Sequence, residues 1–259
     1  KASKPIKINS DVMEEYSPEI AIISSMKEFK DKIRTDIEKR DLSGIEIPIL
    51  VDDYVRMKFH HGHSSIDWYD NWFLGFLNFF LPQYYFNSMM KPDDIIQQDY
   101  AMCSQQSIVF QDVISDYGFD YGSLRFFIPK FSHFTSAVKV DGEWFFFDSN
   151  MEPQYDRRDS SFFKAIMSGD ESILEQIYSQ TNVLDPQSVE ELINTFQVED
   201  VTEEMIVLSD INTFPAPRGV FIQNISYLIS WYGWAISFCI SFILFIRIKR
   251  MNNSLLSKE

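Results

Sequence analysis

A run of residues without any charged side chain, Val220–Ile246, most strongly limits how this chain can fold. Its 27 residues are long enough for a helix that crosses a bilayer with some tilt, because about 20 apolar residues already span one. Arg218 precedes the run, and a basic cluster follows it at Arg247, Lys249 and Arg250. We therefore predict one transmembrane helix over 220–246, embedded in the lipid bilayer.

The flanking residues predict the orientation of this helix. Basic residues favour the cytoplasmic side of a membrane, so we expect the short basic tail at 247–259 in the cytoplasm. The region before the helix is then extracytoplasmic (periplasmic, extracellular or lumenal), and the protein is single-pass. Two prolines make the stretch 215–219 a predicted hinge. Aromatic residues typical of a membrane interface occupy the first half of the run: Tyr227, Trp231, Tyr232 and Trp234.

Charge and cysteine content narrow the function classes. The chain has 259 residues, enough for one domain with a sizeable core. Its net charge of −15 argues against a nucleic-acid partner, because phosphates would be repelled. Only two cysteines are present and Cys239 lies in the apolar run, so a disulfide framework is excluded and Cys103 is the only thiol outside the span. The first residue is Lys1 rather than Met, so what precedes it stays open.

Cys103 lies at the start of a predicted helix. Gly118 ends a segment in which apolar residues recur at helical spacing: Ile108, Val109, Val113 and Ile114. Backbone N–H groups and the positive end of the helix dipole stabilise a thiolate at the first turn of a helix. The position therefore favours a reactive sulfur.

A β-hairpin is predicted to bring His133 and Asp148 together. Two runs rich in valine and phenylalanine flank an Asp-Gly dipeptide at 141–142, which is typical of a two-residue hairpin loop. With that loop, Thr135 lies opposite Asp148, and His133 is a diagonal neighbour on the same face, roughly 7–8 Å away at the backbone. A shift of one residue would place the two side chains on opposite faces.

These residues resemble the core of the transglutaminase-like superfamily, a group of papain-related cysteine enzymes. The similarity covers Gln97 to Pro153 and is carried by a Cys at a helix start, by Arg125 in the next strand and by a His…Asp-Gly-Glu-Trp…Asp pattern over 133–148. The resemblance implies that Cys103 is the nucleophile and that His133 is the general base and acid. It also implies that Asp148 orients the imidazole.

The resemblance also suggests residues around the triad. Papain-like enzymes carry an oxyanion-hole glutamine six residues before the cysteine, which corresponds to Gln97, while Gln98 and Tyr100 are alternative donors. The family often has Gly before the Cys and Trp or Ala soon after the His, whereas this chain has Met102 and Phe134-Thr135. These changes would reshape a substrate groove, for which Phe134 and Trp144 are the candidate lining residues.

A histidine cluster at 60–65 has two interpretations, a metal site or a polar loop. His60, His61 and His63 lie near Asp67 and Asp70, but no partner with metal-ligand spacing follows them. No loop has the regular oxygen-ligand spacing of a calcium site either. We therefore favour a polar loop and predict neither a metal nor another cofactor.

The segment Trp68–Phe80 is the most aromatic part of the chain outside the predicted span. We favour a core helix packed against the catalytic helix. The alternative is a helix at the bilayer surface or against a membrane-protein partner, for which the transmembrane helix would be a second contact. With 13 residues it is too short to span a bilayer.

The elements together predict an α+β fold, and the resemblance implies a papain/transglutaminase-like core in which the catalytic helix packs on an antiparallel sheet. We expect a lead-in and one helix within 1–41, with the helix over 18–40, and the transglutaminase-like domain over 42–214. A short extended segment is expected near 45–59 and a strand at 205–209. Three short helices are expected at 161–167, 170–179 and 186–196.

The predicted function is acyl transfer by a membrane-anchored cysteine enzyme acting on a peptide or another amide-bearing substrate. Water as acceptor gives a protease or amidase, whose substrate could be peptidoglycan, and a primary amine as acceptor gives a cross-linking transglutaminase. The competing class is a non-catalytic transglutaminase-like scaffold or accessory subunit of a membrane complex.

Overall fold

The chain forms two compact units, described here one at a time. The computed structural model describes residues 14–81, 86–127, 132–179, 181, 190, 206–214 and 216–256. Unit 1 comprises Lys1–Ser64 and Met89–Ala216, and unit 2 comprises Ser65–Ser88 and Pro217–Glu259. The domain predicted over 42–214 is therefore interrupted at 65–88. The lead-in at 1–13 and the helix expected at 186–196 lie outside the described residues.

Unit 1 contains a four-stranded antiparallel sheet in the order β5-β4-β3-β6. Its strands are β3 (Asp120–Phe127), β4 (Ser132–Val140), β5 (Glu143–Phe147) and β6 (Ile206–Ser209). Val140 pairs with Glu143 across the two-residue loop, where Asp141 and Gly142 both have positive φ. The predicted hairpin register and the strand near 206 are confirmed, as is the mixed class of helices with an antiparallel sheet.

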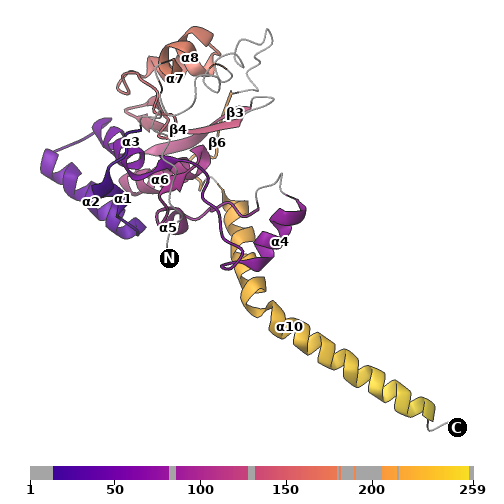
Figure 1. Ribbon diagram of the computed structural model, residues 1–259. Coiled ribbons are helices and arrows are strands. Elements are labelled where there is room, and N and C mark those ends of the chain that lie inside the picture. Colours follow the sequence, from indigo (N-terminus) through magenta and orange to yellow (C-terminus); the bar gives the residue numbers. More distant parts are fainter. Residues whose placement is uncertain are drawn as a thin grey trace. The chain divides into compact units, whose positions relative to one another are not determined.

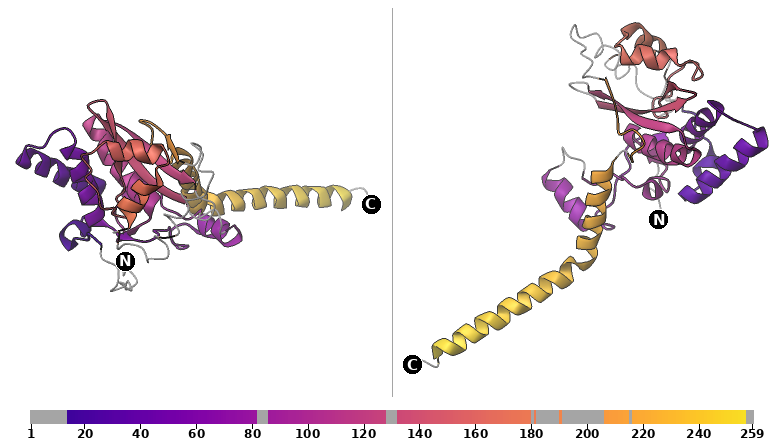
Figure 2. Two further views of the ribbon diagram at one scale, coloured as in Figure 1. Left: turned by 90° about the horizontal axis from the view of Figure 1, so that it is seen from above. Right: turned by 180° about the vertical axis from the view of Figure 1, so that it is seen from behind.

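Helices cover both faces of this sheet (Figures 1 and 2). On one face, α6 (Cys103–Ile114) contacts β4, and the Ser107 hydroxyl donates to the Phe134 carbonyl at 3.2 Å. A short 3₁₀ helix, η2 (Ser115–Tyr117), follows and ends at Gly118 with φ 74°. On the other face lie α7 (Ser161–Met167) and α8 (Glu171–Tyr178), both close to their predicted bounds.

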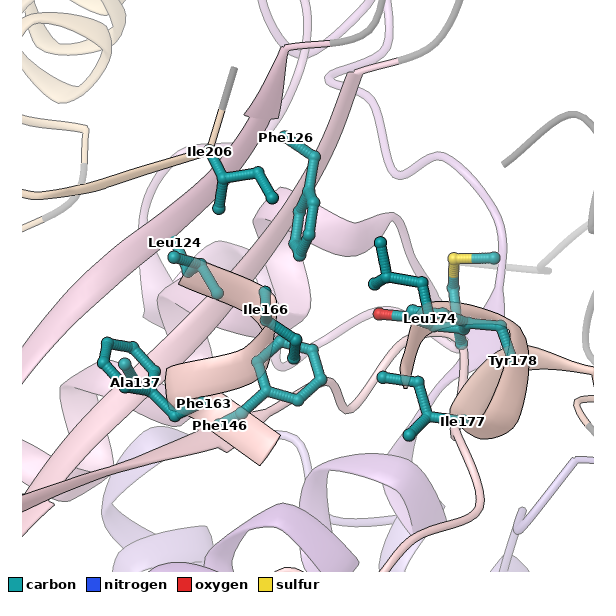
Figure 3. Packing of buried hydrophobic residues seen from close by; sticks show 11 residues of the cluster. Leu124, Phe126, Ala137, Phe146, Phe163, Ile166, Leu174, Ile177, Tyr178 and Ile206 are labelled. Carbon is teal, nitrogen blue, oxygen red and sulfur yellow. The ribbon is translucent and has the colours of Figure 1, made fainter. Parts of the chain in front are cut away.

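The core between the sheet and α7 and α8 is apolar (Figure 3). Burying large side chains of this kind stabilises each by about 1.5–3 kcal/mol relative to exposure. The cluster joins side chains from all four strands of this sheet and both helices: Leu124, Phe126, Ala137, Phe146, Phe163, Ile166, Leu174, Ile177, Tyr178 and Ile206. This packing fixes Tyr178 of α8 against the face of the sheet that carries His133.

The helices before residue 60 differ from the prediction. The helix expected over 18–40 is divided into α1 (Pro18–Ala21) and α2 (Met26–Arg40), because Ser25 adopts an extended backbone and its hydroxyl accepts the N–H of Glu28 as an N-cap. The prediction of an extended segment near 45–59 is wrong. This stretch is α3 (Glu46–Lys58), and Pro48 is tolerated because it falls in the first turn.

Two short strands precede α6. β1 (His60–His61) pairs in parallel with β2 (Tyr100–Ala101), and a one-turn helix, α5 (Pro92–Ile95), precedes β2. Gln105 in α6 stabilises this junction. Its carbonyl oxygen accepts the N–H groups of Met102 and Ser64, and its amide donates to the carbonyl oxygens of Ser64 and Met89. Gln105 therefore links Ser64 and Met89, the residues on either side of the segment 65–88, to the first turn of α6.

Unit 2 consists of α4 (Trp72–Phe80) and α10 (Pro217–Leu256), which contact each other. Among the described residues, α10 is the one helix long and apolar enough to cross a membrane. It already begins at Pro217, inside the predicted hinge, because proline is favoured at the first helical position. It also continues past Ile246 into the basic tail, where Arg, Lys and Met have high helix propensity.

Candidate active site

His133 and Asp148 form a buried hydrogen-bonded pair. The His133 Nε2 atom lies 2.6 Å from Asp148 Oδ2, and both side chains are 1% exposed. The hairpin positions them, because the pairing of Ser136 with Phe147 places residue 148 beside the start of β4. The geometry predicted for this pair is therefore observed.

Donors from three parts of the chain hold the Asp148 carboxylate. Its Oδ2 also accepts the Tyr178 hydroxyl at 2.7 Å, and its Oδ1 accepts the N–H groups of Asn150 and Met151, each at 3.1 Å. Burial raises the pKa of Asp148, but the charge of His133 and these hydrogen bonds outweigh burial and lower it. The carboxylate therefore stays ionised at neutral pH.

His133 is the protonated partner of this pair. Burial lowers the pKa of His133, but the Asp148 carboxylate and the hydrogen bonds with Asp148 and Cys103 outweigh burial and raise that pKa to about 10. The side chain also lies against the ring of Tyr178, with ring centroids 6.3 Å apart in an edge-on arrangement. An imidazolium held between a carboxylate and a thiol can transfer a proton.

Cys103 is the first residue of α6, as predicted, and Met102 is its N-cap. The Cys103 side chain is partly exposed and hydrogen bonds with His133. Because His133 Nε2 is bonded with Asp148, Nδ1 is the ring nitrogen left for the sulfur. The three predicted triad residues are thus brought together, with the sulfur still accessible from outside.

The three oxyanion candidates lie in the stretch between α5 and α6. The Gln97 amide donates to the Asp93 carbonyl at 2.6 Å, within its own helical turn, and Gln97 is exposed. Gln98 is half-buried, and the Tyr100 ring lies beside His60 with centroids 5.8 Å apart. No backbone hydrogen bond of the described residues uses the N–H of Cys103. Such free N–H groups are expected at the first turn of a helix.

The two groove candidates are engaged in other contacts. The Trp144 ring stacks on Phe163 of α7, with centroids 6.0 Å apart, at the edge of the core. The Arg125 guanidinium lies over the Phe134 ring at 5.1 Å and pairs with Asp210. Phe134 follows His133 directly in β4, so its side chain points to the opposite face of the sheet. The lining of a substrate groove by these two rings stays a prediction.

Sequence reasoning missed a second histidine near the triad. The side chain of His61 hydrogen bonds with Asn150, and Asn150 donates to the Ala101 carbonyl at 3.2 Å, two residues before Cys103. Burial lowers the pKa of His61; the Glu14 carboxylate opposes this, and the charge of His133 lowers the pKa further. The histidine cluster in the sequence is a signal for this position, although by itself it indicates only a metal site or a polar loop.

The other histidines do not form a metal centre in the described residues. His60 pairs with the Glu14 carboxylate, which also accepts the N–H of His61 at 2.8 Å, and the Tyr16 ring stacks on His60. No group of three metal-binding side chains is found in the described part of the chain.

A buried ionic network supports the backbone at Asp148. Arg56 of α3 is 2% exposed, and it donates to the Asp148 carbonyl at 3.3 Å. The same guanidinium pairs with Asp52 at 2.9 Å and with Glu15 at 3.5 Å. Arg157 also binds Asp52, at 2.6 Å. Paired charges of this kind tolerate burial, whereas a single one would not.

Comparisons of the chain with models of protein families, with curated proteins and with solved structures give no match.

Proposed function

We propose that this protein is a membrane-anchored cysteine acyl-transfer enzyme with Cys103, His133 and Asp148 as its catalytic triad. The observation that carries the proposal is the chain of contacts from a partly exposed sulfur through a charged imidazole to a buried carboxylate. Each residue alone has ordinary structural roles. The three in this order match the roles of nucleophile, acid–base and orienting group. The fold would then be a papain/transglutaminase-like core.

The reaction begins with attack of the Cys103 thiolate on the carbonyl carbon of an amide. The carbonyl oxygen becomes an oxyanion, for which the N–H of Cys103 is the donor we favour. His133 gives its proton to the leaving amine as the C–N bond breaks, which leaves a thioester on Cys103. Water or a second amine then attacks the thioester, His133 takes up the proton, and the thiolate is released. Water gives an amidase or protease, and an amine gives a transglutaminase.

We place the site outside the cytoplasm. The support is the basic cluster at the C-terminal end of the uncharged run, which favours a cytoplasmic C-terminus. Peptides and other amide-bearing polymers that occur outside the cytoplasm are the substrate class that fits this location.

We expect His133→Ala to slow alkylation of Cys103 by iodoacetamide at pH 7 by roughly 10- to 30-fold. The His133 imidazolium lies beside the sulfur and stabilises the negative charge that the sulfur carries when it attacks, and alanine removes that support. The rate is measured by mass spectrometry of the Cys103 peptide in a Cys239→Ser background, where Cys103 is the only thiol.

His63→Ala is the matched control for this experiment, because it removes an imidazole that is exposed. It should leave the labelling rate unchanged. Equal rates in the wild type and His133→Ala would reject the ion pair and, with it, the enzyme.

The second candidate is a non-catalytic scaffold that binds a membrane complex. The observation favouring it is the exposure of several aromatic side chains in unit 2, such as Phe79 at 75% and Trp234 at 73%. A Cys103 that resists alkylation by iodoacetamide and by maleimides in the folded wild type would support this candidate.

A further inference from the structure

We propose that α4 is a membrane-interface helix, held on α10 at the level of one bilayer boundary with its aromatic side chains among phospholipids. The site is distinct from the triad, and its partner is a lipid surface. The inference rests on α10 spanning the bilayer and is independent of catalysis.

Hydrogen bonds attach the start of α4 to one short stretch of α10. The Asn71 amide is fully buried and donates to the Ser226 hydroxyl at 2.7 Å. The Trp72 N–H donates to the Ser230 hydroxyl at 3.1 Å, and its indole N–H donates to the Ser230 carbonyl at 3.0 Å. Figures 1 and 2 show α4 beside the first part of α10. These bonds fix α4 at the level of residues 226–230.

The position of that stretch along α10 sets the depth of α4. At about 1.5 Å per residue, Ser230 lies about 25 Å along the helix from Arg247, and Ser226 lies about 32 Å from it. The hydrocarbon core of a bilayer is about 30 Å thick. If Arg247 marks one boundary, residues 226–230 therefore lie at the other, and α4 lies there with them.

The surface that α4 presents fits this location. Phe76, Phe79 and Phe80 are 46%, 75% and 62% exposed, whereas Leu74 is buried. They share one face of the helix by their spacing of three and four residues. The helix contains no charged residue, and its nine residues are too few to span. Aromatic side chains at a boundary between water and hydrocarbon are typical of interfacial helices.

A lipid surface explains this exposure better than a protein partner does. The hydrogen bonds to Ser226 and Ser230 place the aromatic face of α4 at a depth where phospholipid already surrounds α10. The only charged residues in the described parts of 65–88 are Asp67 and Asp70, which precede the helix and its cap. Because these charges lie only before the N-terminal end of α4, that end can stay in water while the phenylalanine rings enter the lipid.

A nitroxide spin label at Phe79→Cys tests the inference. The full chain carries Cys103→Ser and Cys239→Ser and is reconstituted in phosphatidylcholine vesicles. Oxygen, which concentrates in lipid, and a nickel chelate, which stays in water, then report the environment of the label. Glu175→Cys on the exposed side of α8 is the aqueous reference, and Ile240→Cys in α10 is the lipid reference.

We expect the ratio of oxygen to nickel collisions at position 79 to exceed that at position 175 several-fold. A ratio at position 79 equal to that at 175, with a lipid ratio at 240, would overturn the inference and leave the span intact. Protection of position 79 from both reagents would overturn it in favour of a protein partner. An aqueous ratio at 240 would overturn the inference together with the membrane span. None of these outcomes depends on alkylation of Cys103, so they are separate from the enzyme proposal.

Discussion

Asp148→Asn is expected to lower the free energy of unfolding by roughly 3–5 kcal/mol, because it breaks a buried charge pair. It is also expected to reduce amide turnover by about three to four orders of magnitude, the size of effect seen when a triad loses its orienting carboxylate. No other single substitution in the site is expected to affect stability and chemistry together to this extent.

The reason lies in how both carboxylate oxygens are used. Oδ2 accepts hydrogen bonds from His133 and Tyr178, and Oδ1 accepts two backbone N–H groups. An asparagine has one oxygen and one NH₂ group. In either orientation of the amide, the NH₂ group replaces a carboxylate oxygen and faces the two hydrogen-bond donors that this oxygen accepted. The amide also carries no charge to hold His133 as an imidazolium. A buried unmet donor costs about 1–3 kcal/mol in addition to the lost ion pair.

Urea denaturation in detergent, followed by near-ultraviolet circular dichroism, measures the stability. Iodoacetamide labelling of Cys103 measures the loss of the charged pair between the sulfur and the His133 imidazolium. Asp141→Asn is the matched control. It makes the same chemical change at the exposed loop of the same hairpin, where φ is 50° and asparagine is well tolerated. If Asp148→Asn behaves like Asp141→Asn in both measurements, the carboxylate does not have the role assigned to it.

The parts of the site that the sequence predicted depend on local rules. The loop at 141–142 sets the register of β4 and β5, and that register alone brings His133 to Asp148. The apolar spacing after Cys103 likewise places the sulfur at a helix start. Both inferences concern residues close in sequence, where turn type and helical period decide the geometry.

The missed parts depend on contacts between distant segments. Tyr178 reaches Asp148 because α8 packs on the sheet, and His61 reaches Asn150 because β1 pairs with β2. Local rules favour an extended backbone around Pro48, but the apolar residues of this stretch also fit a helix, and packing selects the helix. The aromatic helix α4 was expected in a core, but hydrogen bonds to Ser226 and Ser230 hold it on α10.

Glu152→Gln is expected to stabilise the protein above pH 8 by roughly 3–5 kcal/mol, with little effect below pH 4.5. Burial and the neighbouring carboxylates of Glu15 and Glu14 raise the pKa of Glu152 to about 8, although Arg56 opposes this. The Glu15 N–H, 3.1 and 3.2 Å from its two oxygens, also favours the charged form, but burial outweighs both effects. The folded state therefore favours the protonated acid, and glutamine has the same shape without a proton to lose.

The sign of the pH dependence follows from the raised pKa. The stability that the protonated acid contributes is complete below the unfolded pKa of about 4.5, and it is lost as pH rises through about 8 in the folded state. Denaturation of wild type and Glu152→Gln from pH 4 to 9 should thus give curves that separate steadily with pH. Subtracting the two removes the contribution of other titrating groups, and Glu175→Gln on the exposed side of α8 controls for the loss of one surface charge. Parallel curves would show that Glu152 ionises in the folded protein as readily as in the unfolded chain, which its burial at 6% exposure argues against.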